Sequence, residues 1–185
     1  MHKVITDAAA EPLLLADVKL HLRVDTTDDD DLITALIPAA REFAEHYTGR
    51  SLVVRTLEMA MHRFPEYHID LEASPVTSVV SIKYTDAAGV EQTVPDTDYT
   101  LSLYGDSRRV SRGYLKQWPI TQDIADAVRI QYVAGYETLP GAARAAMLLL
   151  IGHWYARREA VGDVKVSEVP LGAINLLNTV KAWDK

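Results

Sequence analysis

A run of aspartates, Asp28 to Asp31, is the first feature of the sequence that could do chemistry, because hard cations bind several carboxylate oxygens. At the start of a helix, however, consecutive side chains diverge around the helix axis. The glycine and the distal glutamate of a calcium-binding loop are also missing. We therefore interpret the run as an N-cap whose negative charge interacts favourably with the helix dipole, and we predict no metal site there.

A basic segment, residues 104–118, is the second candidate. Its cations are interleaved with aromatic residues; the cations are Arg108, Arg109, Arg112 and Lys116, and the aromatic residues are Tyr104, Tyr114 and Trp118. Arginines beside aromatic rings can hold phosphates and stack on bases. Two alternatives fit the same pattern. The segment is either a hairpin with solvated cations and aromatic side chains that face the core, or a loop that contacts an acidic neighbouring subunit. We keep the four cations as candidates for contacts with DNA or with another subunit.

Motifs for catalysis and cofactor binding are absent. The sequence has no phosphate-binding loop, dinucleotide-binding glycine turn, nucleophile elbow or His-Glu-x-x-His helix. There are no cysteines, which excludes thiolate nucleophiles and cysteine metal sites. His153 has no histidine or carboxylate three or four residues away, so we interpret it as a hydrogen-bonded core residue. We expect no catalytic residue, cofactor or metal, with an unrecognised hydrolase as the alternative.

Composition and charge indicate a folded protein without a membrane segment. Apolar residues make up 48% of the chain and charged residues 24%, which is an ordinary globular balance. The longest apolar run, residues 145–156, is too short to span a bilayer. The N-terminus lacks the apolar core of a secretory signal, so we expect cytoplasmic synthesis. A net charge of -7 argues against broad coating of nucleic acid but permits a local basic patch.

Helical periodicity marks both ends of the chain. Apolar residues at helical spacing, Leu15, Val18 and Leu22, predict a short helix that ends near residues 23–25. A longer helix is predicted over residues 32–47, which Gly49 would end. The pattern returns in residues 143–154 after Pro140, a suitable first helical residue. A polar stretch then leads to a last amphipathic segment within residues 169–185.

The middle of the chain alternates between apolar and polar residues, as half-buried strands do. Leu57, Met59 and Met61 share one face of the first predicted strand. Similar runs, separated by turn residues, predict strands over residues 79–84, 90–94, 99–103, 110–115 and 128–133. We predict an α+β fold in which residues 1–51 and 135–185 form a helical core and residues 52–134 form an inserted antiparallel β region.

Several strings of residues carry a family resemblance through their order and spacing. The N-terminal strings are residues 15–25 (LADVKLHLRVD) and 47–52 (YTGRSL), and the C-terminal strings are residues 153–161 (HWYARREAV) and 169–172 (VPLG). Together they resemble the phage head-tail connector, or adaptor, proteins, including the longer members found in prophages and gene transfer agents. One departure is the pair Leu13-Leu14, where such proteins often carry a polar helix cap.

The resemblance implies a structural adaptor without catalytic residues. Such adaptors form a ring, commonly of twelve subunits, beneath the portal protein and link it to tail or stopper proteins, while genomic DNA passes through the channel. The expected location is the head-tail junction of the virion, after assembly in the host cytoplasm. A negative charge balance suits this channel, because a wall that binds phosphates weakly does not arrest the DNA.

The resemblance also implies that the C-terminal segment anchors the subunit to the portal. The segment follows a polar stretch that can act as a tether, and its apolar residues are available to fill a groove. These candidate docking residues are Ile174, Leu177, Val180 and Trp183. The alternative is that this helix completes the core of its own subunit, because a packed terminal helix has the same sequence pattern.

Overall fold

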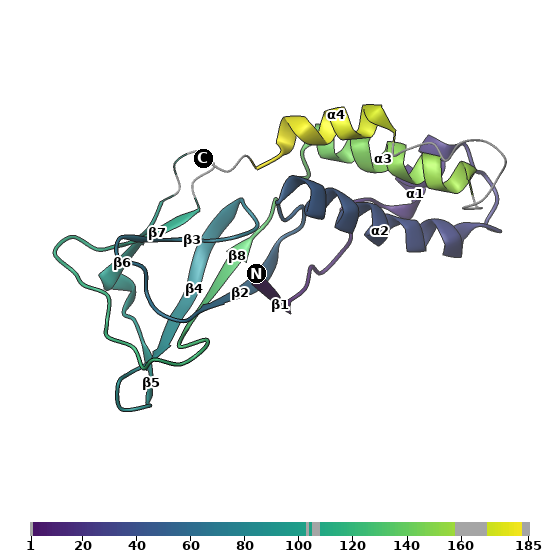
Figure 1. The fold of residues 1–185 in the computed structure, drawn as a ribbon. Helices are drawn as coiled ribbons and strands as arrows, with labels where there is room; N and C mark the ends of the chain where they lie inside the picture. The colour runs from purple at the N-terminus through teal and green to yellow at the C-terminus, as the bar shows by residue number, and fades with distance from the viewer. Residues whose placement is uncertain (1, 103, 105–107, 158–169, 183–185) are drawn as a thin grey trace. The chain divides into compact units, whose positions relative to one another are not determined.

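The chain folds as two compact units in the computed structural model, which describes residues 2–102, 104, 108–157 and 170–182. One unit comprises Met1–Ala8 and Val54–Gly135, and the other comprises Ala9–Val53 and Tyr136–Lys185. The described residues form four α-helices and two antiparallel sheets, so the predicted α+β class is confirmed (Figure 1). None of these helices has the length and apolar character needed to cross a membrane.

The helical unit is built around its third helix. Its elements are α1 (Leu15–Leu22), α2 (Asp30–Thr48), α3 (Gly141–Ala156) and α4 (Leu171–Val180). Helix α3 contacts the other three helices. Its apolar side is fully buried against residues of α2 and α4, among them Ile33 and Leu177, and Met147, Leu150 and Ile151 supply the α3 side of this core. The predicted stripe of residues 143–154 is therefore the core face of α3, with Trp154 partly buried at its end.

The end of α2 also holds α4. Gly49 follows α2 in the left-handed conformation, with φ 67°, which glycine adopts at no steric cost. The Tyr47 hydroxyl donates a hydrogen bond to Asn178 Oδ1 at 2.9 Å, and the Ala182 N–H donates to the Thr48 carbonyl at 2.8 Å. The Arg50 guanidinium also donates to the carbonyl of Val180. The string YTGRSL is thus a helix terminus that binds the C-terminal helix.

A buried arginine joins α2 to the segment that precedes α1. The Arg41 guanidinium donates to both Glu11 oxygens, at 2.8 and 3.2 Å, and to Glu45 Oε2 at 3.0 Å. The other Glu45 oxygen accepts the Leu52 N–H at 2.8 Å. Burial lowers the pKa of Arg41, but the hydrogen bonds and charges of the two glutamates raise it by more, so that it lies above its usual value. Arg41 is therefore a permanently charged link between three segments.

The β unit contains a five-stranded sheet and a three-stranded sheet (Figure 1). The larger sheet has the order β1 (His2–Thr6), β2 (Arg55–Met61), β8 (Val128–Ala134), β4 (Val76–Thr85) and β5 (Glu91–Thr93). The smaller has the order β3 (His68–Asp70), β7 (Arg109–Arg112) and β6 (Tyr99–Leu101), and the 3-10 helix η1 (Asp96–Asp98) precedes β6. Leu57, Ile82, Val110 and Ile130 lie fully buried in the core of this unit.

Two strands were not predicted from the sequence. Strand β1 pairs only with β2, and four of its five residues are exposed, so it shows no burial alternation. Strand β3 has three residues, too few for a periodic signal. The predicted strands over residues 99–103 and 110–115 end earlier, at Leu101 and Arg112. Strands β1 and β3 each form by pairing with a strand that is distant in the sequence, β2 and β7 respectively, so no local pattern predicts them.

The chain enters and leaves the β region on neighbouring strands. Arg55, the first residue of β2, is the register partner of Ala134, the last residue of β8. An insertion needs its two ends to lie close together, as these do. That residues 52–134 are an insertion into a helical domain stays a proposal, which this adjacency supports.

Candidate interaction surfaces

Helix α4 uses its apolar stripe within its own unit. Leu177 is fully buried, Ile174 and Val180 are partly buried, and Trp183 lies outside the described residues. This packing matches the alternative in which the helix completes its own core. Its outward face instead carries Leu171, whose side chain is 74% exposed, followed by the exposed residues Gly172, Asn175 and Thr179.

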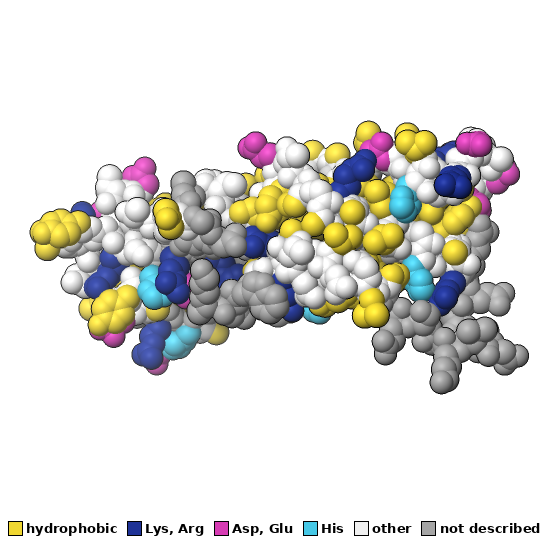
Figure 2. All heavy atoms as spheres, turned by 90° about the horizontal axis from the view of Figure 1, so that it is seen from above, with side chains coloured by type: hydrophobic (Ala, Val, Ile, Leu, Met, Phe, Trp, Pro, Cys, Tyr) yellow, Lys and Arg dark blue, Asp and Glu magenta, His cyan; other side chains and the backbone are white. Residues whose placement is uncertain are grey.

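The two C-terminal helices carry very little charge. Helix α4 has no acidic or basic residue, and in α3 Arg144 is the one Lys, Arg, Asp or Glu. Leu149 of α3 is 39% exposed, and its Cδ1 lies 3.7 Å from the position a Cβ on Gly172 would take, so the outward faces of the two helices meet there. Figure 2 looks onto this side, where hydrophobic and uncharged side chains prevail. Charge depletion of this kind is typical of the centre of a protein–protein interface.

Within the basic segment, residues 109–112 form strand β7, which pairs antiparallel with β6, and residues 113–118 form the loop that follows it. Arg109 Nε lies 2.7 Å from Asp70 Oδ1, and Lys116 Nζ lies 2.7 Å from Asp98 Oδ1. Arg112 donates to Gln117 Oε1 at 2.5 Å. Arg108 is partly buried. Because two of the cations already face carboxylates, they leave less positive charge for phosphates, which weakens the nucleic-acid interpretation.

The aromatic residues of this segment divide into two kinds. Trp118 stacks on Phe64, with ring centroids 4.8 Å apart and an interplanar angle of 3°. Tyr104 and Tyr114 are 91% and 90% exposed. The expectation that the aromatic side chains face the core therefore holds for Trp118 and is wrong for the two tyrosines.

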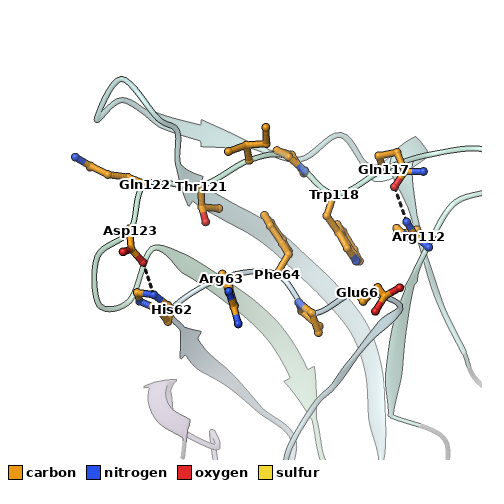
Figure 3. Close-up of a pocket in the computed structure, with 13 residues that line it drawn as sticks. His62, Arg63, Phe64, Glu66, Arg112, Gln117, Trp118, Thr121, Gln122 and Asp123 are labelled. Atoms are coloured by element: carbon orange, nitrogen blue, oxygen red, sulfur yellow. Dashed lines mark hydrogen bonds and ion pairs between the residues drawn. The ribbon is translucent and has the colours of Figure 1, made fainter.

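A hollow of about 430 Å³, which we call the Trp118 hollow, lies beside this stack (Figure 3). Phe64, Pro65, Trp118, Pro119 and Ile120 supply its apolar lining. His62 and Asp123, whose side chains are 2.7 Å apart, lie at its polar edge. The Trp118 Nε1–H is buried and has no hydrogen-bond partner among the described residues. Sequence reasoning missed this hollow, because it forms between two segments that are distant along the chain and carry no shared motif.

The acidic run, residues 28–31, spans the start of α2, and His153 lies near the end of α3. No group of three or more metal-binding side chains gathers in the part of the chain that the structure describes. Asp29 occupies the N-cap position of α2, but its side chain accepts the Tyr155 hydroxyl at 2.5 Å instead of capping the helix, so the predicted side-chain cap is wrong. Asp30 and Asp31 lie in the first turn, where their charge interacts favourably with the helix dipole.

The pairing of Lys116 with Asp98 makes a testable prediction. The hydrogen bond from Lys116 holds the pKa of Asp98 below its ordinary value. The ion pair is therefore fully formed when the pH is above the ordinary pKa of an aspartate, and it is lost as the pH falls through the lowered pKa of Asp98. Lys116→Met should move the Asp98 pKa back toward its ordinary value, as measured by NMR titration. Arg129→Met, which removes an exposed cation paired with Glu91, is the control and should leave the Asp98 pKa unchanged. An unchanged Asp98 pKa in Lys116→Met would contradict the pairing.

Residues 13–103 match the profile of the phage gp6-like head-tail connector protein family. This part, just under half of the chain, is similar to that connector family. The matched residues run through α1 and α2 and continue into the β unit, so the relationship extends beyond the helical strings that suggested it. The resemblance to head-tail connector proteins is thereby confirmed.

Solved structures of gene transfer agent (GTA) particles contain chains with the same fold as this chain. The neck of an empty GTA particle, computed with C6 symmetry, gives a TM-score of 0.82 at 23% identity, over 100% of this chain and 97% of that chain. The neck of a native GTA particle, computed with C12 symmetry, gives 0.80 at 22% identity with the same coverage. The virion of a native GTA particle gives 0.78 at 23% identity, again with the same coverage. Curated protein sequences gave no significant match.

Proposed function

We propose that this chain is a structural head-to-tail adaptor subunit of a tailed phage or phage-like particle. The observation that carries the proposal is the connector-family match over residues 13–103, together with the likeness of the whole chain to neck components of GTA particles. The matched family consists of head-tail connector proteins, and the structural neighbours come from GTA necks and a GTA virion, which favours this function over the hydrolase alternative.

In this role the subunits form a ring beneath the portal protein and connect it to a tail or stopper protein. The similar neck structures were computed with C6 and C12 symmetry, which supports a homo-oligomeric ring, and a dodecamer is our proposal for the particle. Genomic DNA passes through the ring with weak contact. The net charge of -7 and the carboxylate partners of Arg109 and Lys116 favour such weak contact over DNA binding.

Docking to the portal through the C-terminal segment remains part of this proposal, but the structure changes which residues can carry it. Leu177 is fully buried in its own unit, so binding through it would first cost the packing of α4. Leu171, Leu149 and the neighbouring Gly172 are exposed without any rearrangement. We propose that the outward face of α3 and α4 contacts the portal while Ile174, Leu177 and Val180 hold the helix in place.

A charge on this face should abolish portal binding without unfolding the subunit. Leu171→Asp places a carboxylate on the proposed contact face, and a buried unpaired charge strongly opposes association. We expect an unchanged melting temperature and loss of co-sedimentation with purified portal rings. Leu20→Asp is the matched control, because Leu20 is also a highly exposed leucine, at 80%, but lies on α1.

The expected result for Leu20→Asp is wild-type binding. Deletion of residues 169–185 would be a poorer test, because it also removes Ala173 and Leu177 from the core. Normal portal binding by Leu171→Asp, or equal losses for Leu171→Asp and Leu20→Asp, would contradict docking through the α3–α4 face.

A further inference from the structure

Two adjacent large side chains project from the β unit into solvent. Tyr114 is 90% exposed and Leu115 is 84% exposed, on the loop that follows β7. We call this pair the Tyr-Leu knob. Single exposed apolar residues are common on protein surfaces, but adjacent aromatic and aliphatic residues with so little burial are typical of a contact surface, and tyrosine is enriched at the energetic centres of interfaces.

The backbone of the Tyr-Leu knob is held in one conformation. The Gly113 N–H donates to the Asp98 carbonyl at 2.8 Å, and the Lys116 N–H donates to the Gly113 carbonyl at 3.0 Å, closing the turn around the knob. The Lys116–Asp98 ion pair adds a second link to η1. A Cβ on Gly113 would lie 3.2 Å from the Thr97 carbonyl oxygen, so the loop packs closely on η1.

Leu115 itself has a backbone conformation that leucine rarely adopts. Its φ is 60°, in the left-handed region, which costs a residue with a Cβ free energy. Such conformations persist where the surrounding structure enforces them, and they are frequent at ligand-binding positions. A knob that is already ordered loses little conformational entropy on binding, so its exposed apolar surface is available for association.

The same unit carries a recess of matching chemistry. The Trp118 hollow, at about 430 Å³, lies within the range of roughly 300–1,000 Å³ that binding pockets occupy. Its stacked Phe64 and Trp118 rings offer an apolar wall, as Figure 3 shows. The exposed polar residues Arg63, Glu66 and Asp123 also line it and can pair with a tyrosine hydroxyl.

We propose that the Tyr-Leu knob of one copy inserts into the Trp118 hollow of a second copy. The knob does not fill the hollow of its own chain, because both of its side chains are almost fully exposed. Each copy carries both halves of the contact, so the contact can repeat from subunit to subunit and close into a ring. The inference goes beyond the proposed function, because it needs only two copies of this chain and no portal, tail protein or DNA.

Disulfide trapping tests the contact directly, because the chain contains no cysteine. Leu115→Cys places a thiol on the knob, and Glu66→Cys, in a chain with an added tag that changes its size, places one at the hollow. Mixed at high concentration under mild oxidation, the two full-length variants should form a covalent heterodimer. The matched control replaces Glu66→Cys with Val80→Cys, because Val80 is 55% exposed on β4 and does not line the hollow.

The expected yield of the knob–hollow heterodimer is at least about tenfold above the control, because docking raises the effective concentration of the two thiols. Adding Tyr114→Ser to the knob chain, or Trp118→Ala to the hollow chain, should return the yield to the control level. Tyr114 is exposed, so its replacement should leave the melting temperature unchanged even if Trp118→Ala disturbs the fold. Equal yields in the knob–hollow and control mixtures, or no effect of Tyr114→Ser, would overturn the proposal whatever the outcome of the portal-binding experiment.

Discussion

Leu150→Ala should lower the free energy of unfolding of the helical unit by about 2–5 kcal/mol. Leu150 is fully buried at the centre of α3, in a core that includes residues from all four helices. Removing its branched side chain loses the transfer free energy of the missing carbons and leaves a cavity that neighbouring helices fill only in part. Urea denaturation followed by far-UV circular dichroism, which the helices dominate, measures this loss.

The neighbouring leucine provides the control for this experiment. Leu149→Ala makes the same chemical change one residue earlier in α3, at a side chain that is 39% exposed, so it should cost much less. A loss below about half a kilocalorie for Leu150→Ala, within the range of ordinary surface substitutions, would show that the core of the helical unit lies elsewhere.

Arg41→Met should lower the free energy of unfolding by about 3–5 kcal/mol, because it breaks a buried ion pair with Glu45. The side chain of Arg41 is 7% exposed and that of Glu45 is 9% exposed. Without the guanidinium, the buried Glu45 carboxylate loses its ion pair with Arg41, and Glu11 loses its two hydrogen bonds. Chemical denaturation at neutral pH, where both glutamates are ionised in the unfolded chain, measures the effect.

A second substitution should restore part of this stability. Glu45→Gln removes the buried carboxylate charge that has lost its ion pair with Arg41 but keeps a side-chain oxygen for the Leu52 N–H, so Arg41→Met with Glu45→Gln should be more stable than Arg41→Met alone. Arg144→Met is the control for loss of an exposed ion pair: Arg144 is 43% exposed, pairs with Asp17 at 2.8 Å, and should contribute about 0–1 kcal/mol. Equal losses for Arg41→Met and Arg144→Met would contradict the buried role of Arg41.

Leu150 and Arg41 both lie in helices that were predicted from the apolar periodicity of the sequence. The first helix was predicted to end near residues 23–25 and ends at Leu22, and the stripe of residues 143–154 is the core face of α3. A helix can be predicted from local sequence because residues three and four apart share one face. The apolar spacing within a single stretch of chain therefore indicates which face is buried. The connector-family resemblance rested on strings of this local kind and was confirmed over residues 13–103.

The interaction surfaces depend on contacts between residues that are far apart in the sequence. The amphipathic pattern of residues 169–185 could not distinguish docking from core packing, and the hydrogen bond between Tyr47 and Asn178 belongs to the packed arrangement. Likewise, the partners of Arg109 and Lys116 are Asp70 and Asp98, brought close by strand pairing and a loop contact. Periodicity reports which face of an element is apolar, but which neighbour covers that face, and which charges meet, follow from the pairing of distant segments as the whole chain packs.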